Sequence, residues 1–458
     1  MALAPVQWLD RLTAAMDSRA GRFATLRSYM DGAAPLPEGA AAYRDAYRLF
    51  QKKSRTNFGE LVASAPAERM INSGFRIGNA EKDDDQARAI WSRNRLQVGA
   101  SDVHLDMLCL GVGYVMVQPG LDGAVVTVER PEQVIVEYDA FRPDLVRAGI
   151  KVWSDPIEGY DYAMVHIPGE VHTFVRPLED EYGVRIPRNM IQGDWVEFGS
   201  DATGLDVVPI VPFVNRRGLG EFETHLDLLD RINWVILQRL VITAMQAYRQ
   251  RGLSSTEELP TEDEEGNQID YRDVFRPGPG ELWSLPVGAS IWESATTDFT
   301  PILSAVKDDL AHLAAVTRTP MSTLVPDGAN QSAEGAAFAR EGLVFKTLDR
   351  VERAGDAWAL VMGLALALEQ GVSAPVSDVH TEWLPVERQS LAERADAASK
   401  AQDIPWRYRM LKVYQFSAEE VDRMEAEHLA EVEAAKPPPP APVVVAPAAP
   451  VEPDGEPV

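Results

Sequence analysis

Cysteine is almost absent from this chain. Among its 458 residues only Cys109 carries a thiol, so neither an internal disulfide nor a zinc site built from several cysteines is available. The neighbouring residues Met107, Leu108 and Leu110 are apolar. Such a setting favours a buried small side chain over a reactive nucleophile.

Positive charge is scarce as well. Acidic residues outnumber basic ones 70 to 44, which gives a formal net charge of −26. Proteins that hold DNA tightly neutralise its phosphates with a basic surface. The composition therefore argues against tight, static DNA binding, although it is compatible with a surface along which DNA passes without sticking.

Long apolar runs are missing too. No apolar stretch reaches roughly 18 residues, the length of a membrane helix. The richest stretch, 232–248, is interrupted by Asn233, Gln238, Arg239 and Gln246, so we expect a buried helix there and no membrane partner. The N-terminal segment has neither a charge-free apolar core nor a cleavage-site pattern, so we expect no signal peptide and a cytosolic assembly or life cycle.

Motifs of known catalytic chemistry are not found. The phosphate-binding pattern Gly-x-x-x-x-Gly-Lys-Ser/Thr does not occur, and Gly111-Val112-Gly113 leads into a strand-like segment instead of the helix that a dinucleotide site requires. The seven histidines are scattered, and none belongs to a His-Glu-x-x-His pattern. We therefore expect no catalytic residue, no metal site and no cofactor.

Two smaller groups of titratable residues have structural interpretations. Asp83, Asp84 and Asp85 stand where a helix is expected to begin, so capping and the helix dipole account for them better than a metal ion does. His166 and His172 bracket a Pro-Gly turn. They are candidate neighbours across a hairpin, in a structural role.

Helix-forming sequence is abundant. From Glu221 to Arg251 there is no proline, and apolar residues recur at spacings of three to five, which predicts a helix roughly 45 Å long. A second helix is expected from Thr300 to Arg318, ending before Thr319-Pro320. After a short polar loop over 321–331, Ser332 is expected to cap a helix that runs to Gln370. Further helices are expected over 5–30, 57–69, 83–95, 99–110, 387–400 and 417–435.

Between Gly111 and Asn215 the apolar pattern changes to that of strands. Short aromatic and β-branched segments alternate with turns, which predicts a mainly antiparallel β region. Two short strands are expected about Pro286 within 281–293, and Val379–Leu384 is a further strand that could rejoin the β region. The fold class is therefore α+β. The strands of the β region are expected at 114–117, 124–129, 133–138, 148–153, 162–166, 171–176, 194–198 and 207–215.

Two segments have a biased composition. Residues 254–280 form an acidic, turn-rich insert that contains Glu262, Asp263, Glu264 and Glu265. These four acids fit a solvated loop or a docking surface for a basic partner. Residues 437–458 are rich in proline, alanine and valine and are expected to form a disordered tail.

Taken in order, these elements resemble those of portal proteins, the head-to-tail connectors of tailed double-stranded DNA bacteriophages, in the siphophage-type branch. The resemblance covers roughly residues 20–435. It is carried by short segments in a fixed order: Asn57-Phe58 to Gly74-Phe75, Val208–Asn215 ahead of the first long helix, Asn330–Gly335 at the start of the longest helix, and Ile404-Pro405-Trp406 followed by Ser417–Glu420.

The resemblance implies a mainly helical portal fold whose subunits form a dodecameric ring around a DNA channel. The β-rich wing would be residues 1–217, joined by a long wing helix and a returning strand within 332–386. The remaining regions would be stem helix 1 at 218–252, a small α/β clip at 253–296, stem helix 2 at 297–319, a tunnel loop at 320–331, a helical crown at 387–436 and the tail at 437–458.

The same resemblance points to residues that face DNA. The tunnel-loop candidates are Ser322, Thr323, Asp327, Asn330 and Gln331. On stem helix 2, Lys307, Asp308 and Arg318 are candidates to line the channel. Lys307 and Arg318 would either touch phosphates transiently or pair with Asp308 or Asp309 of a neighbouring subunit.

In the clip, the candidates for partner docking are the four acids Glu262, Asp263, Glu264 and Glu265 together with Trp283 and Trp292. The tryptophans fit two interpretations. They are either interface anchors, since buried aromatic residues carry much of the energy of an interface, or they are the core of the clip itself.

The function implied is that of a non-enzymatic portal subunit, at one capsid vertex of the virion and in the host cytoplasm during assembly. Its partners would be further copies of itself, the terminase large subunit during packaging, a head–tail connector or adaptor protein afterwards, and the major capsid protein with its scaffold. Double-stranded DNA would pass non-specifically. The alternatives are another virion structural protein, such as a capsid or connector subunit, and an enzyme with an unrecognised site.

Overall fold

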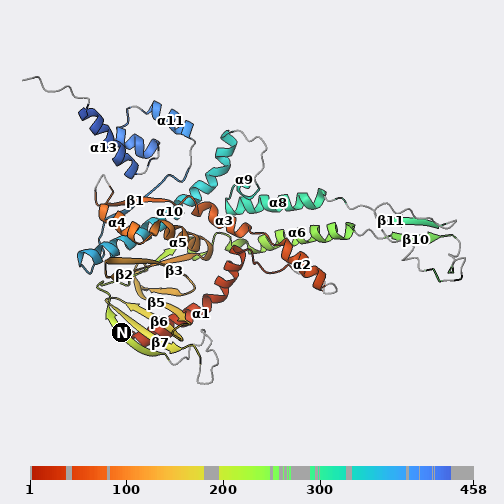
Figure 1. Cartoon of the computed structure of the whole chain (residues 1–458), viewed down its shortest axis with the longest axis horizontal. Helices are drawn as coiled ribbons and strands as arrows, with labels where there is room; N and C mark the ends of the chain where they lie inside the picture. Colours follow the sequence, from red (N-terminus) through yellow and green to blue (C-terminus); the bar gives the residue numbers. More distant parts are fainter. Residues whose placement is uncertain are drawn as a thin grey trace, which may run out of the picture. The chain divides into compact units, whose positions relative to one another are not determined.

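The computed structural model describes residues 3–37, 44–79, 83–179, 195–247, 251–256, 261–262, 266, 268–269, 289–293, 298, 300–325, 333–387, 391–401, 403–414, 416 and 418–434. The chain divides into two compact units, Met1–Glu387 and Arg388–Val458. Figure 1 shows the helices and strands along the chain.

In the described part of 112–214, the strands form two antiparallel sheets, as the sequence predicts. In one sheet β2 (Val112–Gly120) lies between β3 (Gly123–Glu129) and β9 (Ile210–Val214). The other sheet has the order β4 (Val134–Tyr138), β5 (Val146–Asp155), β6 (Tyr160–Ile167), β7 (Glu170–Pro177) and β8 (Val196–Ala202). With the helices around them, these sheets confirm the α+β class.

The first helix covers one face of the larger sheet. α1 (Pro5–Met30) places Trp8, Leu9 and Leu12 on this face, where they are buried against Ile150 of β5 and Phe174 of β7. Burying side chains of this size stabilises the contact by about 1.5–3 kcal/mol each. The amphipathic pattern expected over 5–30 is therefore the packing face of α1.

The main core lies around the smaller sheet and the longest helix. α3 (Phe58–Ala67), α4 (Asp85–Arg93), α5 (Leu96–Leu110) and α10 (Ala333–Gln370) enclose it. Trp358 of α10 is fully buried, with ring centroids 5.0 Å from Phe213 and 4.9 Å from Trp91. Helix α2 (Arg44–Ser54), which was not predicted from the sequence, packs against α6 (Leu226–Ala247).

The glycines of Gly111-Val112-Gly113 serve close packing. Gly111 ends α5 with φ 85°, and a Cβ there would lie 2.2 Å from the carbonyl oxygen of Gly218. A Cβ on Gly113 would lie 2.6 Å from the carbonyl oxygen of Val103. Both positions therefore need glycine for the turn from α5 into β2.

Other small predictions are settled by local contacts. Cys109 is fully buried, and burial raises the pKa of its thiol to about 12. Asp84 caps α4, because its Oδ1 accepts a hydrogen bond from the backbone N–H of Ala87 at 2.7 Å.

His166 and His172 are not neighbours across the hairpin, contrary to the expectation. His166 pairs with Val171 and His172 pairs with Val165, so the two rings point to opposite faces of the sheet.

The first long helix is shorter than the expected 221–251. α6 runs from Leu226 to Ala247, after a single 3-10 turn, Glu223–His225. The backbone N–H of Glu221 donates to the carbonyl of Leu108 at 2.7 Å, so the chain is still held by the end of α5 at this point. At the other end Arg251 already belongs to a strand, β10 (Arg251–Ser255).

Two strands have partners that the sequence did not reveal. β11 (Ala289–Glu293) pairs with β10 in an antiparallel ribbon, whereas a hairpin about Pro286 was expected; 281–288 lie outside the described residues. β12 (Val379–Trp383) pairs with β1 (Asn72–Ile77) and not with the sheets of the β region. Both pairings join segments far apart in the chain, which a local pattern cannot specify.

The remaining helices follow the prediction closely. α8 covers Thr300–Thr317 and ends ahead of Pro320, and α10 ends at Gln370 as expected. The segment expected as a polar loop begins with one helical turn, α9 (Met321–Leu324). In the second unit, the structure contains α11 (Leu391–Lys400), α12 (Trp406–Tyr408), η4 (Arg409–Val413) and α13 (Ala418–Ala434). Residues 437–458 lie outside the described part.

Candidate functional site

Helices α6 and α8 pack against each other as a pair (Figure 1). α8 turns Leu310 and Leu313 inward, and both are buried. Arg231 Nη2 of α6 lies 2.7 Å from Asp309 Oδ1 of α8. Asp309, one of the acids considered as a partner for a neighbouring subunit, is therefore already paired within its own chain.

A group of buried charges joins this helix pair to the rest of the unit. We call Asn215, Glu221, Thr317, Lys346 and Arg350 the junction cluster. Arg350 Nε donates to Glu221 Oε1 at 2.8 Å, and Asn215 Nδ2 donates to the same oxygen at 3.1 Å. Lys346 Nζ lies 3.4 Å from Glu221 Oε2 and donates to the carbonyl of Thr317 at 2.8 Å. The cluster thus connects β9, the entry to α6, the end of α8 and α10.

The ionisable side chains of the junction cluster remain charged although they are buried. The side chains of Glu221, Lys346 and Arg350 are 4%, 5% and 10% exposed. Burial alone would raise the pKa of Glu221, but the adjacent Lys346 and Arg350 cations outweigh it and hold that pKa below its ordinary value. Burial lowers the pKa of Lys346, which the Glu221 carboxylate opposes. Each charge in this cluster depends on its partners, because an unpaired buried ion is strongly disfavoured.

A second set of contacts fixes the start of α6. The guanidinium of Arg22 in α1 donates two hydrogen bonds of 2.6 Å to the carboxylate of Glu223. It also donates to the carbonyl of Gly218 at 2.8 Å. Tyr29 Oη donates to Asp230 Oδ1 at 2.6 Å. These bonds attach the start of α6 and the turn before it to α1.

The predicted stem residues are at the surface. Lys307, Asp308 and Arg318 are all exposed. Arg318 takes a left-handed backbone conformation with φ 53°, directly after α8 ends. Exposure of these side chains is what the predicted channel-lining role requires.

The predicted loop and clip residues are only partly described. Ser322 is exposed and Thr323 half-buried, both within α9. Trp292 on β11 is 60% exposed, and Glu262 forms an isolated bridge with Gln268. The other candidates lie outside the described residues: Asp327, Asn330, Gln331, Asp263, Glu264, Glu265 and Trp283.

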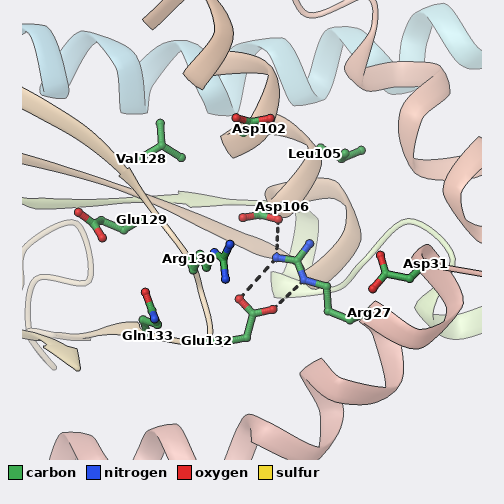
Figure 2. A pocket seen from close by; sticks show the side chains of 10 residues that line it. All are labelled: Arg27, Asp31, Asp102, Leu105, Asp106, Val128, Glu129, Arg130, Glu132 and Gln133. Carbon is green, nitrogen blue, oxygen red and sulfur yellow. Dashed lines mark hydrogen bonds and ion pairs between the residues drawn. The ribbon is translucent and has the colours of Figure 1, made fainter. Parts of the chain in front are cut away.

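A polar hollow of about 750 Å³ lies between α1, α5 and the β3–β4 connection (Figure 2). Arg27 extends into it and pairs with Asp106 at 2.6 Å and with Glu132 at 2.7 Å. Burial raises the pKa of Asp106 to about 6, although Arg27 opposes this. The described lining contains no histidine, cysteine or serine, and Arg27 forms an ionic tie there between α1, α5 and the β3–β4 connection.

Sequence reasoning missed both ionic groups. Their members come from segments far apart in the chain, so no local motif unites them. One signal was available: Lys346 and Arg350 stand four residues apart beside the apolar stripe of α10, whose members Leu343, Thr347 and Val351 are buried. Basic residues next to a core stripe indicate a buried acidic partner.

A family model described as "Phage portal protein, SPP1 Gp6-like" matches residues 9–434. The chain belongs to the phage portal protein family. The resemblance seen in the sequence is thereby confirmed, and this portal chain is matched over nearly its whole length.

Relatives of this portal chain carry the same name. The portal protein of Mycobacterium phage D29 is 25% identical over 370 residues, which cover 76% of this chain and 72% of the relative. The portal protein of Mycobacterium phage L5 is 24% identical over 414 residues, which cover 85% and 81%.

Solved structures give a more distant likeness. A chain from the neck of an empty gene transfer agent particle has a TM-score of 0.48 and 14% identity, covering 82% of this portal chain and 95% of its own length. A chain from the virion of a native particle of this kind has a TM-score of 0.46 and 11% identity, covering 86% and 98%. The family assignment rests on the sequence matches.

Proposed function

We propose that this chain is the subunit of a homo-oligomeric ring, of about a dozen copies, at one vertex of a tailed-phage capsid. Double-stranded DNA would enter the capsid through the ring during packaging and leave through it at ejection. The observation that carries the proposal is the portal family match over residues 9–434. The net charge of −26 supports it, because like charge opposes the phosphate contacts that would arrest moving DNA.

The regional assignments are part of this proposal. α6 and α8 would be the stem helices, the β10–β11 ribbon part of the clip, and the sheets with α10 the wing. The second unit, from Arg388 onward, would contain the crown. The junction cluster would then hold both stem helices to the wing at one fixed place.

DNA would meet the tunnel loop and the exposed stem charges Lys307, Asp308 and Arg318. The clip, with Trp292 exposed on β11, would dock the terminase large subunit and later a connector protein. The wing would contact the major capsid protein and its scaffold, and the ring would nucleate capsid assembly in the host cytoplasm. The chain itself would carry no catalytic activity and would rely on the terminase for ATP hydrolysis.

The first experiment is negative-stain imaging of the purified full chain with light scattering for mass. The proposal expects rings with a central channel and about twelve copies. If the chain alone stays a monomer, co-expression with capsid and scaffold proteins should yield the ring. A compact dimer without a channel under both conditions would contradict the proposal.

A second experiment tests the tunnel loop. Leu324 of α9 is 5% exposed and belongs to the core, so the change should spare it and replace only 326–331 by glycine and serine. Rings should form as in the wild type, while DNA packaging into capsids should fall at least tenfold. Loss of rings, or packaging at the wild-type level, would remove this role from the loop.

A further inference from the structure

Helix α2 has a basic, exposed face in an otherwise acidic protein. Arg48, Leu49, Lys52 and Lys53 are all exposed, and Leu49 is 55% exposed. At 100° per residue these four side chains span about 140° of the helix circumference. An apolar side chain ringed by three cations indicates a surface that another group of opposite charge covers.

Helix α10 has a face with the opposite character. Glu341, Phe345, Leu348, Glu352 and Asp356 are exposed and lie within about 80° of one another around the helix. Phe345 is 60% exposed and Leu348 42%. This stripe, which we call the α10 outer stripe, is roughly 22 Å long and carries two large apolar side chains between acids.

The acids of the α10 outer stripe have no ion pair with any other described residue. Arg353, on the same helix, is engaged with Asp349, with Arg353 Nε 3.2 Å from Asp349 Oδ2. Three carboxylates therefore remain available beside Phe345 and Leu348.

The helices that carry these two faces, α2 and α10, lie on opposite flanks of α6. Arg231 of α6 points to α8, whereas Asn233 Oδ1 accepts hydrogen bonds from Thr56, just after α2, at 2.7 and 2.9 Å. Two residues correspond to about 200° around a helix, so α8 and the α2 segment hold opposite sides of α6, as Figure 1 also shows. α10 belongs to the α8 flank, because Lys346 bonds Thr317 at the end of α8.

We propose that the basic face of α2 in one copy of this chain covers the α10 outer stripe of a neighbouring copy. This rests on the proposed ring function. Two complementary faces on helices at opposite flanks of α6 allow each copy to bind the next in the same way, and such a head-to-tail contact forms a ring when the rotation between successive copies closes. Copies with a net charge of −26 repel one another at long range, so their contact must match opposite local charges.

A DNA phosphate backbone on α2 is the competing occupant. It would use Arg48, Lys52 and Lys53 but would leave Leu49 of α2 and the acidic, apolar stripe of α10 without a role. A second copy uses both faces, and this is why the structure favours it.

The test is a reciprocal charge reversal in the full chain. Arg48→Glu with Lys52→Glu, and separately Glu341→Lys with Glu352→Lys, should each raise the protein concentration needed for half-maximal ring assembly at least about tenfold, since like charges then face each other. Combining all four changes in one chain should restore assembly to within about twofold of the wild type. Arg142→Glu, on an exposed loop outside both faces, is the matched control and should have no effect. Circular dichroism melts should show all variants folded.

A cross-link provides an independent measurement. Cys109 is fully buried, so a chain with Leu49→Cys mixed with a chain with Leu348→Cys offers only the new thiols. After ring assembly and mild oxidation, the mixture should give several times more covalent dimer than either variant alone. The pair Arg142→Cys with Leu348→Cys is the control for chance encounters.

The outcomes separate the two proposals. Two results overturn this interface while leaving the ring function intact. One is wild-type assembly of both charge-reversed variants. The other is a variant with all four changes that fails to recover assembly, together with cysteine variants that give no specific cross-link. Unchanged assembly with weaker DNA retention in the α2 variant assigns α2 to DNA and overturns it as well. A wild-type chain that never forms rings, even with capsid and scaffold proteins, contradicts the proposed function itself.

Discussion

Glu221 is the residue on which the junction cluster depends. Its carboxylate is the counter-charge to both Lys346 and Arg350, which come from α10. The same carboxylate accepts a hydrogen bond from Asn215, which directly follows β9. Buried ions of this kind contribute little net stability as a complete set, but removing one partner leaves the others uncompensated. The junction is therefore sensitive to the loss of a single charge.

Glu221→Gln should destabilise the first unit by about 3–5 kcal/mol, because two buried cations then lack their counter-charge. Urea unfolding followed by circular dichroism measures the change. Glu179→Gln removes an exposed carboxylate and should stay within about 0.5 kcal/mol of the wild type. Equal effects of the two changes would show that the junction charges are not coupled.

Asp106 should give the chain a distinctive pH dependence. Burial raises its pKa to about 6 in the folded state, so between pH 4 and 6 the folded chain holds a proton that the unfolded chain has released. Stability from this group is complete below about pH 4 and is lost as pH rises through 6, by up to about 3 kcal/mol.

The measurement compares the wild type with Asp106→Asn, because other groups have the opposite slope. Burial lowers the pKa of His104 to about 3 and of His166 to about 4, so their contribution is lost as pH falls below about 6.5. The melting temperature of the variant minus that of the wild type should rise between pH 4 and 6. A flat difference would contradict the raised pKa.

At the scale of elements, α10 organises the first unit. Its buried stripe packs against β2, β3, β9 and β12. Its first half carries the junction cations Lys346 and Arg350, and the α10 outer stripe extends across its middle. The helix N-terminal to it, α9, enters the same core through Leu324. A substitution in α10 can therefore affect the packing of the sheet, the junction cluster and the proposed interface.

Two glycines of α10 should respond oppositely to the same substitution. A Cβ on Gly363 would lie 2.5 Å from the carbonyl oxygen of Val376, which folds back onto the helix, whereas on Gly342 it would lie 3.6 Å from Arg318 Cβ. Gly342→Ala should stabilise by about 0.5–1 kcal/mol through helix propensity. Gly363→Ala should destabilise by about 1–3 kcal/mol through overpacking. Thermal melts of the two variants measure the difference in sign.

At the scale of the whole molecule, charge sets how the chain meets DNA. Acids outnumber bases by 26, and the described basic side chains of the interior, such as Arg27 and Arg350, are engaged by carboxylates. The surface therefore repels phosphates over most of its area.

Purified rings should bind a short duplex DNA only weakly at physiological salt, with a dissociation constant above about 10⁻⁴ M, the weak end of non-specific binding. Fluorescence anisotropy of a labelled duplex measures it. Micromolar binding would contradict the picture of a conduit through which DNA slides without being held.

The class of fold, the position of most elements and the family could all be predicted from the amino-acid sequence. Helical and strand periods depend on neighbouring residues, so α1, α8, α10 and the antiparallel β region could be predicted from local pattern. The family match then confirmed the portal resemblance carried by short segments in fixed order. Of the predicted site residues, Lys307 and Asp308 lie on α8 and Arg318 directly follows it, and the sequence had placed the end of this helix to within one residue.

Which distant segments contact each other became known from the three-dimensional fold. β12 pairs with β1, β10 pairs with β11, and Glu221 leaves the expected helix to meet Lys346 and Arg350. The same holds for Asp106 with Arg27 and for the opposite flanks of α2 and α10. Such contacts form when segments far apart in the sequence pack together. The residues adjacent to each partner in the sequence do not specify which distant segment it will contact.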